Sequence, residues 1–118
     1  MASVTINKLS LRDYILPSQA DDTNPTRYKI RPMNGMEHMD VLSITDLDEN
    51  GHMRYKGPAL KKVINYGLKG WENLLNSDGE EVKFSPAEIN NLSPIDLHYI
   101  ATEIINISEL TGDERKNS

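Results

Sequence analysis

Apolar positions recur with helical spacing in two long stretches of the chain and alternate near its start. In residues 60–71 they follow the spacing i, i+3, i+4, i+7, i+8, i+11, which predicts a central core helix over 58–70. A second stripe predicts a helix over 94–110, with an inward face formed by Leu97, Ile100, Ala101, Ile104, Ile107 and Leu110. Residues 26–31 alternate strictly and predict a strand, whose hairpin partner we expect within the partly alternating segment 4–16.

Capping residues predict the remaining helix starts. Asn34 precedes Glu37 by three positions, a capping box that predicts a helix to about Ile44, with Met36, Met39, Leu42 and Met33 on its buried side. Ser85-Pro86 and Ser93-Pro94 each place a serine cap before a proline, which predicts two helix starts. Because these starts are only eight residues apart, the first helix must be very short. Asn76 to Gly79 predicts a tight turn.

These elements predict an α+β fold, in which an N-terminal β-hairpin packs on a bundle of about three main helices with short connecting helices and turns. With 118 residues, 37% of them hydrophobic, the chain fits one domain, 1–118. We divide it into an extended hairpin part (1–32), a mainly helical part (33–110) and a polar C-terminal tail (111–118).

Two large aromatic residues stand close together in an aromatic-poor chain. Trp71 and Phe84 are the only tryptophan and phenylalanine, and they flank the predicted turn at Asn76 to Gly79. We expect both to be buried anchors where the central helix meets the final helices. This interpretation gives the segment a structural role.

Composition and charge exclude several classes of function. The net charge of −5 disfavours a nucleic-acid binder that relies on phosphate neutralisation, and no apolar run approaches a membrane span. The N-terminus lacks the pattern of a secretion signal, so we expect an intracellular, soluble protein. Arg27, Lys29 and Arg31 share one strand face. They form either a phosphate-binding surface or, as the acidity favours, a solvated face near Asp13.

An oxygen-rich run resembles the start of an EF-hand calcium loop. Asp46, Asp48 and Asn50 stand at positions 1, 3 and 5, before Gly51 at position 6. Position 12, where a bidentate glutamate is needed, is a glycine. We therefore interpret this run as a turn and keep the three residues only as weak metal candidates.

Motifs for catalysis are missing. The three histidines have no metal-ligand spacing, no cysteine exists, and neither nucleophile elbows nor phosphate-binding glycine loops occur. We therefore expect no enzyme activity and no cofactor. The clustered methionines Met33, Met36 and Met39 either fill the core or line an adaptable groove for partner helices.

Four segments together resemble a known family. They are Arg31-Pro32-Met33-Asn34-Gly35-Met36-Glu37, Val63 to Leu68, Gly70-Trp71-Glu72-Asn73-Leu74 with Asp78-Gly79 and Phe84-Ser85, and Glu103-Ile104-Ile105 to Glu109-Leu110-Thr111. Over residues 26–117 the chain is similar to tail assembly chaperones of tailed bacteriophages, most specifically in the run 70–85.

The resemblance implies a non-enzymatic protein of the bacterial host cytoplasm, absent from the mature virion. Its partners would be the phage tape measure protein and the tail tube protein, and it could form homo-oligomers. A client helix laid in a groove needs exposed apolar positions. Our candidates are Met36, Met39, Leu42, Leu97, Ile100, Ile104 and Ile107.

Two other functions stay open at this point. A small acidic phage protein could be an inhibitor or decoy that occupies a basic site on a host protein. A calcium-dependent regulator would instead use Asp46, Asp48 and Asn50.

Overall fold

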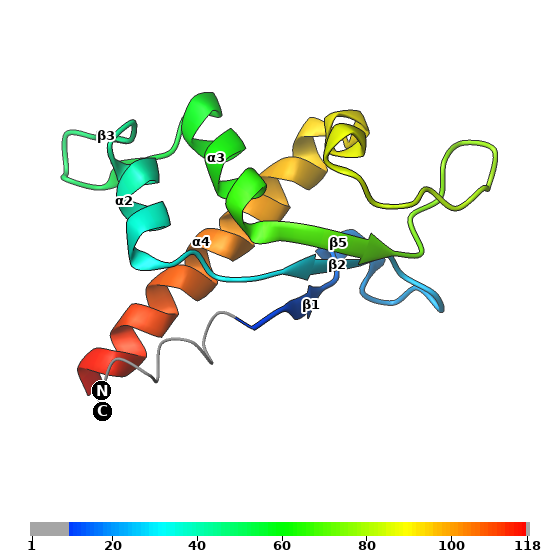
Figure 1. The fold of residues 1–118 in the computed structure, drawn as a ribbon, viewed down its shortest axis with the longest axis horizontal. Helices are drawn as coiled ribbons and strands as arrows, with labels where there is room; N and C mark the ends of the chain where they lie inside the picture. The colour runs from blue at the N-terminus through cyan, green and yellow to red at the C-terminus, as the bar shows by residue number, and fades with distance from the viewer. Residues whose placement is uncertain (1–9, 118) are drawn as a thin grey trace.

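The fold is α+β, as the sequence predicted: a small antiparallel sheet packs on helices (Figure 1). This computed structural model describes the backbone of residues 10–117 and the side chains of residues 10–109. The strands of the main sheet, in spatial order, are β1 (Arg12–Tyr14), β2 (Arg27–Ile30) and β5 (Leu68–Glu72). A two-stranded ribbon consists of β3 (Asp46–Leu47) and β4 (Met53–Arg54). The helices are η1 (Pro17–Gln19), α2 (Gly35–Leu42), α3 (Gly57–Gly67), η2 (Pro86–Asn91) and α4 (Pro94–Asn117).

The predicted N-terminal hairpin exists, but it gains a third strand. β1 pairs antiparallel with β2, with Asp13 opposite Lys29, and the residues before Ser10 lie outside the described part of the chain. β2 also pairs with β5, which the sequence analysis had assigned to the end of a helix. The predicted helix over 58–70 is therefore wrong beyond Gly67.

An irregular register explains why β5 imitated a helix. Tyr28 pairs with Trp71, and Ile30 pairs with Leu68, so three steps along β5 match two steps along β2. A strict strand would place Leu68 and Trp71 on opposite faces. One extra residue at this bulge turns both toward the core, where they are 2% and 8% exposed. The i, i+3 spacing that indicates a helix is thus also satisfied by a bulged strand.

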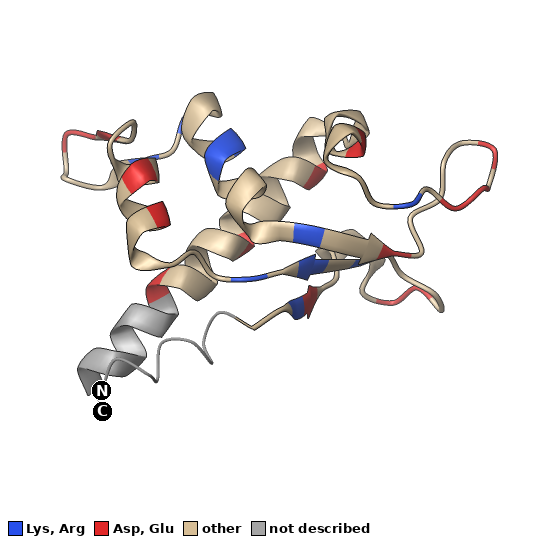
Figure 2. Ribbon diagram, viewed as in Figure 1, with Lys and Arg blue, Asp and Glu red and all other residues tan. Residues whose placement is uncertain are grey.

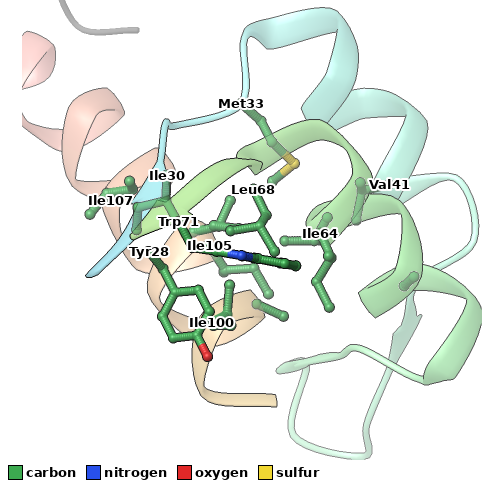
Figure 3. Packing of buried hydrophobic residues seen from close by; sticks show 14 of the residues in the cluster. Tyr28, Ile30, Met33, Val41, Ile64, Leu68, Trp71, Ile100, Ile105 and Ile107 are labelled. Atoms are coloured by element: carbon green, nitrogen blue, oxygen red, sulfur yellow. The ribbon is translucent and has the colours of Figure 1, made fainter. Parts of the chain in front are cut away.

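Trp71 is buried in the core as predicted, although in β5 and not at a helix end, whereas Phe84 is only partly buried. The Trp71 ring meets Phe84 edge to face with centroids 4.8 Å apart, and it meets Tyr28 in the same way at 6.2 Å. The indole Nε1 donates a hydrogen bond to the Val82 carbonyl oxygen at 2.8 Å. Figure 3 shows Trp71 within the buried apolar cluster, while Phe84 packs against that cluster from its border. These contacts tie the segment after the turn to the sheet.

The interface between α3 and α4 forms the other half of the core. Val63 of α3 and Ile100 and Ile104 of α4 have no exposed area. Gly67 faces Ile104 so closely that a Cβ on the glycine would stand 2.6 Å from the Ile104 Cγ2 atom. The absence of a side chain at Gly67 is therefore what permits this contact.

The local start signals for helices are confirmed. Asn34 and Glu37 form the complete capping box of α2, Ser85 caps η2, and the Ser93 Oγ accepts from the Asp96 amide at the start of α4. The turn at Asn76 to Gly79 is present, with Gly79 at φ +81°. α4 continues to Asn117, beyond the end predicted near Leu110.

Candidate functional site

Helix α2 presents two methionines to solvent instead of burying them. Met36 is 77% exposed and Met39 is 64% exposed, so the prediction that they lie on the buried side is wrong. Leu42 is half-buried, and Met33, just before the helix, is 6% exposed. Only Val41 of α2 is fully buried.

The exposed face of α2 follows from the residues that fix its other face. Glu37 receives two hydrogen bonds from the Arg31 guanidinium, both at 2.8 Å, and these bonds lower the pKa of the Glu37 carboxyl. Asp40 accepts from Lys62 and from the Tyr66 hydroxyl of α3. Glu37, Asp40 and Val41 share the i, i+3, i+4 face, so Met39 points the other way and Met36 lies at the edge of that face.

A groove of about 450 Å³ runs between α4 and the segment that joins β4 to α3. The α4 wall is a single helical stripe, because its residues are spaced by four, three, one and three positions. These residues are His98, Thr102, Ile105, Asn106 and Glu109. The opposite wall consists of Met53, Tyr55 and Leu60. The groove therefore combines an apolar wall with one mixed helical face.

Apolar surface continues from the groove onto the β3–β4 ribbon. Leu47 lies directly opposite Met53 in the antiparallel register, so the two side chains share one face of the ribbon. Leu47 is 61% exposed and Met53 is 46% exposed. We use the name ribbon groove for the surface formed by the groove-lining residues, which include Met53, together with Leu47.

One end of the ribbon groove is acidic. Burial raises the pKa of the Tyr55 hydroxyl, and the nearby Glu109 carboxylate raises it further. Glu109 is exposed, and both residues line the groove. A basic group on a bound molecule could form an ion pair with the Glu109 carboxylate at this end.

The α4 residues predicted to contact a partner lie on the other face of the helix. Ile100, Ile104 and Ile107 are 0%, 0% and 6% exposed, and Leu97 is half-buried against the core. The expectation that they form an exposed stripe is wrong, because the main sheet and α3 cover them. The groove face of α4 was missed because its apolar content is low. Its exposed residues His98, Thr102 and Asn106, spaced by four positions, resemble an ordinary solvated helix face.

The three weak metal candidates serve the ribbon turn and its surroundings. Asp48 Oδ1 accepts the backbone N–H groups of Asn50 and His52 at 2.8 and 2.9 Å. Asp46 forms an ion pair with Lys56 at 2.9 Å, which lowers the pKa of the Asp46 carboxyl. In the residues that the structure describes, no three acidic, histidine or cysteine side chains are grouped to hold a metal ion.

The basic strand face is neutralised by neighbouring carboxylates. Lys29 Nζ lies 2.5 Å from Asp13 Oδ1 and 3.5 Å from Glu72 Oε1, and Arg27 approaches Asp13 at 4.0 Å. Arg31 is engaged by Glu37. Figure 2 shows the acidic positions of β1 and of the end of β5 on either side of the basic positions of β2. The geometry favours the solvated-face interpretation over phosphate binding.

Comparison of the chain with family models, with curated proteins and with solved structures gave no match. Within residues 10–117, no helix combines the length and apolar content that crossing a membrane requires.

Proposed function

We propose that this protein is a non-enzymatic binding protein whose ribbon groove holds the apolar face of a helix in a client protein. The observation that carries the proposal is the continuity of exposed apolar side chains at Leu47 and Met53 with a groove of about 450 Å³. Exposed apolar surface that continues into a concavity is typical of interaction sites.

The chemistry of the site suits a helix more than a small substrate. Recognition of an amphipathic helix in a groove relies on apolar anchors spaced by three and four residues. Met53 offers an unbranched, polarisable side chain that adapts to varied partners. Met36 and Met39 provide further exposed apolar surface on α2.

The identity of the client comes from the resemblance to phage tail assembly chaperones. On that basis, the client is the tape measure protein, a long helical chain that the groove would keep soluble until tail tube subunits assemble around it. The protein would act in the cytoplasm of the bacterial host. The acidic end of the groove at Glu109 would pair with a basic residue of the client helix.

Co-expression with the tape measure protein encoded by the same phage or prophage tests this proposal. We expect the wild-type chain to keep the client in the soluble fraction and to co-purify with it. Met53→Glu places a charge in the groove and should abolish co-purification. Because Met53 is partly exposed, the unfolding free energy of the variant should differ from that of the wild-type protein by no more than about 0.5 kcal/mol.

Ile95→Glu is the matched control, because Ile95 is 69% exposed at the start of α4 and does not line the groove. It should retain the client. Failure of the wild-type chain to bind or solubilise the tape measure protein would refute the assigned client. If Met53→Glu changes only self-association in sedimentation, the ribbon groove is an interface between copies, and the proposal is wrong.

A further inference from the structure

A second, more polar hollow lies near the start of α4. It has a volume of about 360 Å³, and its walls come from the linker before β2, from β2, from the segment that follows β5 and from α4. We call it the polar pocket. Its size falls in the lower part of the range typical of ligand sites, about 300 to 1,000 Å³.

The amide side chains of the polar pocket are held in place by one another. Gln19 Oε1 accepts from the Thr26 amide at 2.8 Å, and the Thr26 hydroxyl donates to the Asn73 carbonyl oxygen at 3.1 Å. Asn73 Nδ2 donates to Asn24 Oδ1 at 3.0 Å. These bonds join the linker before β2 to the segment that follows β5.

Two carboxylates of the polar pocket have no counter-charge. Asp22 and Asp96 line it, and the described lining residues include no lysine, arginine or histidine. Over residues 10–109, neither carboxylate belongs to an ion pair. Elsewhere in the molecule Asp13, Glu37, Asp40 and Asp46 are all paired with cations. The polar pocket therefore brings together two carboxylates that no cation neutralises.

The hydroxyl of a buried tyrosine opens onto this pocket. Tyr28 is 1% exposed and lines the polar pocket, yet its hydroxyl has no hydrogen-bond partner among the described residues. Figure 3 places the Tyr28 ring within the apolar cluster, with the hydroxyl at its border. Burial, and then the Asp96 carboxylate, raise the pKa of Tyr28 to about 12, so the phenol stays protonated and keeps an oxygen lone pair for a donor.

We infer that the polar pocket binds an organic cation, the guanidinium or ammonium group of a basic side chain on a partner protein. Such a group carries only donors, and it would meet the Asp22 and Asp96 carboxylates and the Tyr28 hydroxyl oxygen. Two carboxylates fall short of the ligand set that a divalent metal ion needs, whereas they match one cationic side chain. This inference does not depend on the proposed function, because it concerns a different surface.

Titration of the ¹⁵N-labelled chain with N-acetyl-arginine-N-methylamide and with N-acetyl-lysine-N-methylamide tests the inference. We expect saturable shifts of the Thr26 and Asn73 amide resonances with at least one of the two. The neutral citrulline analogue, which keeps the shape of arginine, should cause none. Asp22→Asn and Asp96→Asn should each weaken binding by about fivefold or more.

Two further variants separate binding from folding. Glu49→Gln removes one exposed carboxylate on the ribbon turn and should leave the affinity unchanged. Tyr28→Phe should weaken binding by about two- to threefold without lowering the thermal midpoint, because the hydroxyl has no partner in the described chain. Equal shifts with the citrulline analogue, unchanged affinity in both aspartate variants, or the same shifts produced more tightly by Ca²⁺ would overturn the inference.

Discussion

Two regions of the molecule place large apolar side chains in opposite environments. The junction around Trp71 buries them, whereas the β3–β4 ribbon exposes them to solvent. At the junction, Trp71 is 8% exposed and its one polar atom donates to the Val82 carbonyl oxygen. On the ribbon, Leu47 and Met53 remain 61% and 46% exposed, while the turn satisfies its own polar groups through Asp48. The junction thus contributes to stability, and the ribbon leaves apolar surface unused by the fold. The part of the molecule that stabilises the fold is therefore separate from the part for which we propose binding.

Truncation of Trp71 should lower the stability of the protein more than any other change that we propose. Trp71→Ala removes the edge-to-face contacts with Phe84 and Tyr28 and leaves a cavity, so we expect a loss of about 3 to 5 kcal/mol in unfolding free energy. Urea denaturation followed by circular dichroism measures it. Met53→Ala is the counterpart on the ribbon and should cost well under 1 kcal/mol. Similar losses for the two variants would contradict the comparison.

An added methyl group at Gly67 should give the next largest effect. Gly67→Ala would bring its Cβ to 2.6 Å from Ile104, whose side chain is fully enclosed, so we expect a loss of about 1 to 3 kcal/mol. Gly57→Ala is the matched control, because nothing lies within 4 Å of the corresponding Cβ. A neutral or stabilising Gly67→Ala would show that α3 and α4 are farther apart than described.

The ion pair that orients α2 should contribute a smaller, pH-dependent amount. Hydrogen bonds from Arg31 lower the pKa of Glu37, so this stability is fully present above the unfolded pKa, about 4.3, and is lost as the pH falls through the lower folded value. We expect about 1 kcal/mol, because both side chains remain partly exposed. Glu37→Gln keeps a capping side chain and should remove this part of the pH dependence between pH 5 and pH 2. Measurement of the unfolding free energy against pH checks this. The same pH dependence in Glu37→Gln and in the wild-type protein would contradict a stabilising role for the Arg31–Glu37 ion pair.

The sequence correctly predicted the features that depend on interactions between residues close together in the chain. The capping box at Asn34 and Glu37, the serine caps and the turn at Asn76 to Gly79 are all local, and all are present. The end of α3 could not be predicted in the same way, because a bulged strand reproduces the apolar spacing of a helix at Leu68 and Trp71.

The candidate site was harder to predict because exposure depends on tertiary contacts. Periodicity correctly placed Ile100 and Ile104 on one inward face of α4, and this burial removes them as contacts for a partner, the second role that we expected of them. By contrast, the spacing of Met36 and Met39 could not show that ion pairs on the opposite side of α2 would turn them outward. The ribbon groove joins residues from β4, α3 and α4, which no single stretch of sequence reveals.

Methionine methyl resonances give the most direct test of the claim that the ribbon groove binds the client. In the chain labelled with [methyl-¹³C]methionine, addition of a helical fragment of the tape measure protein should shift the Met53 resonance. It should leave that of Met33, which is 6% exposed, unchanged at the same ratios. A complex that forms while the Met53 resonance stays in place would contradict the account, and so would the absence of any complex.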